Sequence, residues 1–127
     1  MTNEVAQTDK RVTGVEDLPV YVPAADVYEA PDRYVISVDL PGVGESDLEL
    51  NLEEGVLRIA AVRPELQEAQ GRSLIQEWEP CRYERSFRLA SDCDSGKIEA
   101  SLRNGVLTVT IPKIETARPR KIPVRAE

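Results

Sequence analysis

The pattern of residues 98–111 constrains the fold of this chain more than any other feature. Ile98, Ala100 and Leu102 alternate with polar residues, which is the period of a strand with one buried face. Asn104-Gly105 follows, a pair that favours the positive φ angles of a tight type I′ turn. Residues 106–111 lead back as a second strand, and Pro112 ends the pairing because it has no N–H to donate. The stretch therefore predicts a β-hairpin.

Five more segments show the period of a strand and are bounded by turn residues. In the clearest, residues 47–53, three leucines alternate with Asp, Glu and Asn. Pro41-Gly42 and Glu54-Gly55 mark two of the turns. Short strands at this spacing, without a helix-length amphipathic segment, predict an all-β, immunoglobulin-like antiparallel β-sandwich of seven to eight strands. The remaining strand segments are residues 26–29, 34–40, 56–62 and 83–89, with 73–79 as a further candidate.

The composition disfavours several classes of function. A net charge of −7 argues against nucleic acid and anionic membranes as partners, because both need a basic surface. No apolar run reaches the roughly 18 residues of a membrane span, and residues 1–10 lack the apolar stretch of a signal peptide, so we expect a cytoplasmic protein. The chain has no histidine and no glycine-rich phosphate loop, which leaves no candidate catalytic, cofactor or metal site. An enzyme is therefore not expected.

Three parts are predicted along the chain. Residues 1–22 form a flexible arm, since they show no periodicity, and residues 23–113 form the sandwich domain. Within the domain, residues 63–80 form a charged connection that is long for a compact β domain. Residues 114–127 form a tail, in which Ile122-Pro123-Val124 holds two apolar side chains on an extended segment, so that both can enter one groove. A final edge strand on the chain's own sheet is the alternative for this motif.

Several motifs occur in a fixed order. Residues 25–29 read A-D-V-Y-E, residues 38–43 read V-D-L-P-G-V, and residues 83–89 read Y-E-R-S-F-R-L. Residues 100–113 contain A-x-x-x-N-G-V-L and then T-V-T-I-P-K, and residues 122–124 read I-P-V. Together they resemble the motifs of the small heat-shock proteins of bacterial type, the α-crystallin-domain family. The resemblance implies an ATP-independent chaperone, a holdase that binds partly unfolded client proteins and suppresses their aggregation under stress.

The resemblance also implies a homodimer in which a strand of the central connection is exchanged between subunits. In this chain the exchanged strand is residues 73–79, and Arg85 aligns with the family's arginine near the interface. We expect a partner carboxylate to neutralise Arg85, because Arg85 lies on an otherwise apolar strand face; the alternative is a solvated charge on an edge strand. The predicted dimer-interface residues are Ser73, Leu74, Ile75, Gln76, Glu77, Trp78 and Arg85.

Larger homo-oligomers are implied through the tail. In the family the C-terminal motif docks in a groove of a neighbouring dimer, which assigns Ile122 and Val124 as the docking side chains. We expect apolar segments of clients to bind this groove when it is transiently exposed. The predicted groove residues are Leu48, Leu50, Leu52, Ile98, Ala100 and Leu102.

Some features depart from the family pattern. The arm contains no Phe or Trp, Cys81 stands where the family has glycine, and Trp78 stands where it has arginine. We expect Cys81 to be a buried, inert thiol rather than a redox sensor. The alternative function is a cochaperone or adaptor module that resembles the CS-domain proteins and has no holdase activity. That alternative leaves the Ile122-Pro123-Val124 motif and the exchanged strand without a use.

Overall fold

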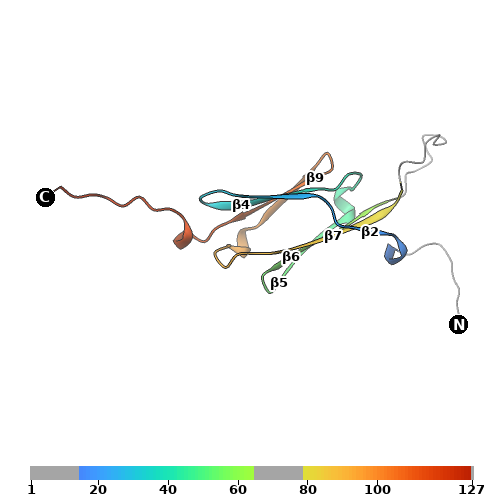
Figure 1. Ribbon diagram of the computed structural model, residues 1–127, viewed down its shortest axis with the longest axis horizontal. Helices are drawn as coiled ribbons and strands as arrows, with labels where there is room; N and C mark the ends of the chain where they lie inside the picture. Colours follow the sequence, from blue (N-terminus) through green and yellow to red (C-terminus); the bar gives the residue numbers. More distant parts are fainter. Residues whose placement is uncertain (1–14, 65–78, 127) are drawn as a thin grey trace.

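Two β-sheets lie face to face in the computed structural model, which describes residues 15–64 and 79–126 (Figure 1). One sheet has the strand order β2-β7-β6-β5 and the other the order β3-β4-β9-β8. Eight strands and no α-helix lie in these residues, which confirms the predicted β-sandwich. The strands are β2 (Val20–Tyr21), β3 (Ala25–Glu29), β4 (Arg33–Asp39), β5 (Leu48–Glu53), β6 (Val56–Arg63), β7 (Cys81–Arg88), β8 (Glu99–Arg103) and β9 (Val106–Pro112), and the 3₁₀ turns are η1 (Val15–Asp17), η2 (Glu45–Asp47), η4 (Ser95–Lys97) and η5 (Glu115–Ala117).

The core lies between the sheets and follows from the alternation of apolar residues. Val38 of β4 pairs with Leu107 of β9, and Ile36 pairs with Val109. These four side chains are at most 2% exposed, and Ile59 of β6 faces them with no exposed surface. Each contributes about 1.5–3 kcal/mol by leaving water. A shift of one residue in the register would turn a whole strand's apolar set to solvent, so burial fixes the pairing.

Two tight turns connect the antiparallel hairpins. In the predicted hairpin, β8 and β9 pair from Glu99↔Thr110 to Arg103↔Val106. Asn104 and Gly105 have φ angles of 53° and 77°, which is the pattern of a type I′ turn. Glu54 and Gly55, with φ angles of 52° and 79°, join β5 to β6 in the same way.

The segment before the domain has structure that the sequence does not predict. A flexible arm is expected over residues 1–22, but Val20 and Tyr21 form β2, which runs parallel to β7. The backbone N–H of Arg82 also donates a 2.8 Å hydrogen bond to the carbonyl oxygen of Pro19. A two-residue strand shows no alternation, so its sequence carries no signal. Among the strand pairs of the described residues, β2 and β7 are the one parallel pair, and all the others are antiparallel as predicted.

The tail leaves the sandwich as an extended segment (Figure 1). Beyond η5, residues 118–126 form no strand. The side chains of Ile122 and Val124 are 78% and 94% exposed. A final edge strand on the chain's own sheet is therefore wrong, and both apolar side chains are free to meet another surface.

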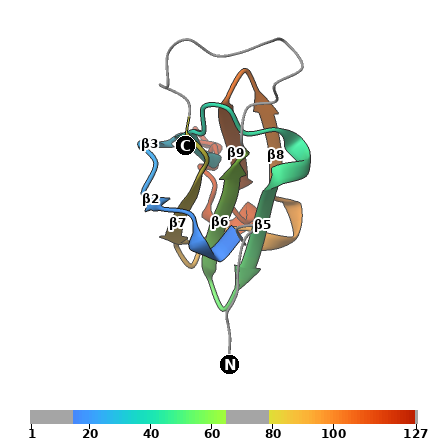
Figure 2. The same cartoon turned by 90° about the vertical axis from the view of Figure 1, so that its right-hand side faces the viewer.

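Among residues 15–64 and 79–126, no further strand pairs with either long side of the sandwich (Figure 2). β5 and β8 are the edge strands on one side, and β2 and β3 are the edge strands on the other. An edge strand presents unpaired backbone N–H and C=O groups, so each side can accept an added strand. Across the two described ranges, no helix has the length and apolar character to cross a membrane.

Candidate functional site

The six predicted groove residues come together along one open side of the sandwich. Leu48, Leu50 and Leu52 of β5 pair with Ala61, Ile59 and Leu57 of β6, all of which are buried. On the facing sheet, Ala100 and Leu102 of β8 pair with the buried Val109 and Leu107. Paired residues point to the same face of a sheet, so all five side chains point between the sheets. Ile98, just before β8, packs against the same core. We call this set the β5–β8 groove.

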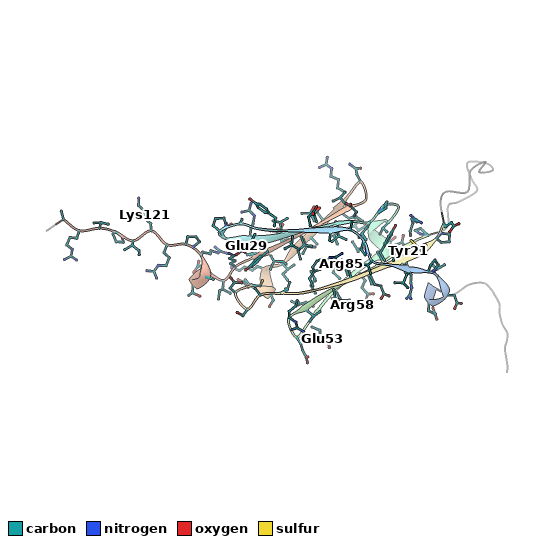
Figure 3. All side chains as sticks on the ribbon, in the orientation of Figure 1. Tyr21, Glu29, Glu53, Arg58, Arg85 and Lys121 are labelled. Atoms are coloured by element: carbon teal, nitrogen blue, oxygen red, sulfur yellow. The ribbon has the colours of Figure 1, made fainter. Side chains whose placement is uncertain are left out.

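The charge around the β5–β8 groove complements the tail. The outward positions of β5 carry Glu49 and Glu53, both exposed. The tail and the lysine before it, residues 113–127, contain five Lys or Arg residues against two Glu. Figure 3 shows Lys121, next to Ile122, far from the sandwich of its own subunit. A tail that reaches the groove of another subunit therefore brings positive charge to a negative strand.

The other open side is formed by β3. This strand pairs only with β4 among the described residues, so its outer edge has no partner there. Val27 and Tyr28 on β3 are 61% and 64% exposed. The predicted exchange residues 73–78, from Ser73 to Trp78, lie outside the described residues. The ends of their connection are held together, since the Arg63 guanidinium donates to the carbonyl oxygen of Glu79 from Nε at 2.8 Å and from Nη2 at 2.6 Å.

Arg85 lies between the two sheets (Figure 3). Its Nη1 donates a 2.8 Å hydrogen bond to the carbonyl oxygen of Pro23, in the segment that crosses from one sheet to the other. Its guanidinium carbon also lies 5.2 Å from the centre of the Phe87 ring, within cation–π range. Arg85 is half-buried. β2 pairs with β7 only at Arg82 and Tyr83, so at Arg85 this edge of β7 has no partner strand among the described residues, and a solvated charge at a strand edge stays the alternative. The partner carboxylate stays a prediction.

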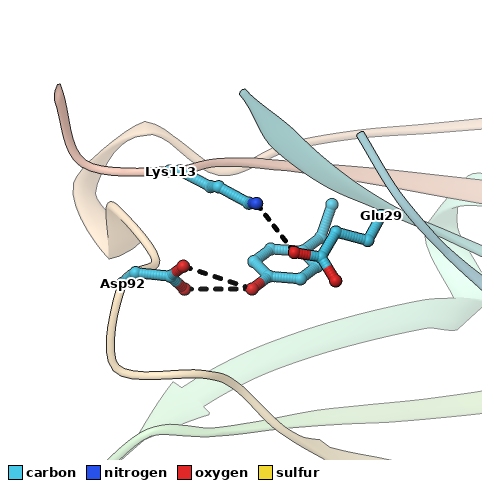
Figure 4. Close-up of polar contacts among 4 residues, drawn as sticks. Glu29, Asp92 and Lys113 are labelled. Carbon is cyan, nitrogen blue, oxygen red and sulfur yellow. Dashed lines mark hydrogen bonds and ion pairs between the residues drawn. The ribbon is translucent and has the colours of Figure 1, made fainter. Parts of the chain in front are cut away.

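A polar cluster, missed in the sequence, closes one end of the sandwich (Figure 4). Lys113, which follows β9, is 7% exposed, and its Nζ lies 2.8 Å from Glu29 Oε2 at the end of β3. The same Nζ lies 5.0 Å from the centre of the Tyr34 ring. The Tyr34 hydroxyl donates to Asp92 at 3.1 Å. These contacts tie β3, β4 and β9 to the loop after β7 at the base of the tail. Lys113 ends the T-V-T-I-P-K motif, but the motif gives no indication of its partner.

The cluster shifts two pKa values. The hydrogen bond to Glu29 raises the pKa of the Lys113 ammonium and outweighs burial, which lowers it. Burial and then the hydrogen bond to Asp92 raise the pKa of the Tyr34 hydroxyl. Both groups therefore keep their protons more strongly than in an unfolded chain.

The two cysteines do not form a reactive site. Cys81 is fully buried in the core, in keeping with an inert structural thiol. Burial, with the negative charge of Asp92, raises the pKa of the Cys93 thiol, which makes its thiolate scarcer. Residues 15–64 and 79–126 contain no group of three or more His, Cys, Asp or Glu residues placed to hold a metal ion.

Similar proteins were found at the levels of family, sequence and structure. Residues 26–125 match the model of the Hsp20/alpha crystallin family. The 18 kDa antigen 1 of Mycobacterium avium is 37% identical over 123 residues, which cover 97% of this chain and 82% of that protein.

Solved structures agree with this match. Heat shock protein 16.0 from Schizosaccharomyces pombe superimposes with a TM-score of 0.67 at 28% identity, over 84% of this chain and 99% of that one. A small heat-shock protein from Xylella fastidiosa gives a TM-score of 0.61 at 30% identity, over 84% and 98%. These matches favour the chaperone family over the CS-domain alternative. On the fold and these similarities, the chain belongs to the Hsp20/alpha crystallin family and is a small heat-shock protein, a member of a family of chaperones.

Proposed function

We propose that this small heat-shock protein is an ATP-independent holdase whose two open sandwich sides are covered by other subunits at rest and bind non-native clients when uncovered. The observation that carries the proposal is the row of inward-facing apolar side chains in the β5–β8 groove, left uncovered by the chain's own tail. The action is binding alone, without a catalytic step or a cofactor.

The tail motif is the resting occupant of the β5–β8 groove. Ile122 and Val124 are two residues apart on an extended segment, the spacing at which two side chains point the same way. Their full burial gains about 3–6 kcal/mol, whereas association costs about 4–15 kcal/mol in lost freedom. One docked tail is therefore weak, and several together hold an assembly. Such contacts open readily, which leaves the groove free for apolar client segments.

The dimer forms at the other side, where the exchange strand of one subunit pairs with β3 of its partner. The unpaired outer edge of β3 and its exposed Val27 and Tyr28 support this placement. The Xylella fastidiosa protein is described as having a distinct high order structure, which supports assembly beyond a dimer here as well.

The test is heat-induced aggregation of a reporter protein, followed by light scattering without ATP. We expect suppression near one subunit per reporter molecule. Full aggregation at a severalfold excess of the chain would reject holdase action.

A further inference from the structure

The base of the tail is fastened to the sandwich by hydrogen bonds. The Lys113 N–H donates to the carbonyl oxygen of Asp32 at 2.9 Å, and the Ile114 N–H donates to that of Asp92 at 2.8 Å. The Lys113 side chain is also held, since its Nζ lies 2.8 Å from Glu29 Oε2. The tail therefore starts from a fixed point at the end of the sandwich.

Arg118 extends this anchorage by one turn beyond the sandwich. In η5 the Ala117 N–H donates to the carbonyl oxygen of Ile114 at 2.9 Å, and the Arg118 N–H donates to that of Glu115 at 3.2 Å. The Arg118 Nε also donates to the carbonyl oxygen of Lys113 at 3.0 Å, so a charged side chain closes the turn. Because the backbone hydrogen bonds of a 3₁₀ turn have poor geometry, we expect this charge-assisted bond to contribute a large share of the turn's stability.

Two prolines stiffen the chain between Arg118 and the apolar motif. Pro119 favours an extended backbone at Arg118, which has a φ angle of −86° and a ψ angle of 152°. Pro123 restricts Ile122 in the same way. Proline-stiffened segments rise by about 3.1 Å per residue, so Ile122 stands about 12 Å beyond Arg118. Residues 119–126 are all exposed and run away from the sandwich (Figure 1). The direction set at η5 therefore reaches the motif.

We propose that Arg118 is a positioning residue, which aims the tail away from its own subunit and so presents Ile122 and Val124 to another one. With the turn closed, four residues lead from Arg118 to Ile122; with the turn open, eight lead from Ile114. A longer free segment spreads the motif over a larger volume, which lowers its effective concentration at a neighbouring groove. The inference rests on the tail docking proposed above and adds the residue that gives the tail its direction.

The first experiment measures the direction of the tail in a full chain that cannot dock, because both apolar tail residues are replaced by serine. Spin labels are attached to Ser101→Cys in β8 and Arg125→Cys in the tail, both at exposed positions. Cys93→Ser removes the other accessible thiol, since Cys81 has no exposed surface. Labelled chain is diluted with unlabelled chain, so that the distances measured between spin labels lie within one subunit.

Arg118→Met is compared with Arg120→Met in this labelled chain. Arg118→Met removes the donor to Lys113 and keeps an unbranched side chain. Arg120→Met removes the same charge two positions later, where the side chain is exposed, and is the matched control. We expect Arg118→Met to make the distribution of label distances about twice as wide, because eight free residues replace four. Arg120→Met should leave the width unchanged, and equal widths in the two variants would overturn the inference.

The second experiment measures assembly by native mass spectrometry in chains that keep the apolar motif. Arg118→Met should reduce the fraction of chains in assemblies larger than the dimer about threefold, and Arg120→Met should not. Circular dichroism should give both variants the unfolding temperature of the parent chain, because Arg118 lies outside the core.

The outcomes separate this inference from the docking proposal. If replacing both apolar tail residues reduces the assembly while Arg118→Met does not, docking stands and the positioning role of Arg118 is overturned. If neither change reduces it, the docking proposal fails and the inference falls with it.

Discussion

The backbone N–H of Leu40 donates a 2.7 Å hydrogen bond to the carbonyl oxygen of Gly105. The turn between β8 and β9 therefore rests on the loop that follows β4. A Cβ atom added at Gly105 would stand 3.2 Å from the Cα of Pro41 and 3.4 Å from the carbonyl oxygen of Leu40. The D-L-P-G-V and N-G-V-L motifs are thus two halves of one contact, in which the glycine allows two backbones to approach closely.

Gly105→Ala should destabilise the fold more than Gly55→Ala. Both glycines have positive φ angles, so alanine costs about 1–2 kcal/mol of backbone strain at either position. A Cβ at Gly55 meets nothing within 4 Å, whereas a Cβ at Gly105 presses on the backbone of Pro41. We expect Gly105→Ala to lose at least about 1 kcal/mol more, as measured by urea unfolding. Equal losses in the free energy of unfolding would show that backbone strain alone accounts for the effect of both substitutions.

The core and the groove should respond differently to truncation. Ile59 has no exposed surface and Leu52 is 38% exposed, although both point between the sheets. Ile59→Ala should reduce the free energy of unfolding by about 2–5 kcal/mol. Leu52→Ala should cost less than about 1 kcal/mol, since much of its side chain already contacts water. Urea unfolding of both variants measures the difference, and comparable losses would mean that Leu52 is a core residue rather than part of a docking surface.

Much of this architecture could be predicted because it depends on local patterns. Alternation along β5 and the Asn104-Gly105 turn each depend on a few adjacent residues. The predicted strands that fall on described residues, which leaves out residues 73–79, agree with the structure to within one or two residues. Inward-facing groove residues follow from the same alternation. β2 could not be predicted, because its two residues are held by pairing with β7, some sixty positions later.

The polar contacts of the site cannot be predicted from the sequence, for a different reason. Arg85 was expected to need a carboxylate, but within the described residues a backbone carbonyl and an aromatic ring surround it. Every residue carries a carbonyl group, so composition cannot show which one a guanidinium meets. Lys113 and Glu29 are 84 positions apart and become neighbours only when β3, β4 and β9 are assembled.

Glu29→Gln should lower the temperature of unfolding at neutral pH by several degrees. The substitution leaves the Lys113 ammonium, at 7% exposure, facing a neutral amide instead of a carboxylate. Glu49→Gln on β5 is the control, because Glu49 is exposed and outward-facing. Thermal unfolding followed by circular dichroism measures both variants. An equal effect of the two substitutions would show that net charge, rather than the contact with Lys113, is responsible.

Alkaline pH should destabilise the fold through the same cluster. The folded-state pKa values of Lys113 and Tyr34 are raised above 10.5 and 10.0, so the folded chain holds these protons more tightly than the unfolded chain. The contribution of these two groups to the free energy of unfolding is complete below their unfolded-state pKa values. It is lost as pH rises through their folded-state pKa values. The free energy of unfolding should therefore fall above about pH 10, and less steeply in Tyr34→Phe. If the free energy of unfolding falls equally steeply with pH in Tyr34→Phe, Tyr34 does not contribute to the alkaline destabilisation.

Replacing Ile122 and Val124 together by serine should reduce the assembly to dimers and leave the sandwich intact. The two side chains are 78% and 94% exposed within their own subunit, so their loss removes little internal burial. In an assembly, each docked tail loses about 3–6 kcal/mol of the free energy gained by burying its two apolar side chains, and these losses add up over all the tails. Native mass spectrometry measures the assembly, and the temperature of unfolding at low concentration should stay within about 1 °C of the parent chain.

The matched control for the tail is Arg120→Ser with Arg125→Ser, which keeps both apolar side chains and removes two charges next to the motif. If burial drives docking, the control keeps assemblies larger than the dimer and makes them less sensitive to salt, because its attraction to Glu49 and Glu53 is weaker. If the control dissociates to dimers while the variant with both apolar tail residues replaced does not, charge rather than apolar burial holds the tail. That result would reject the β5–β8 groove as the docking site, since its inward face is apolar.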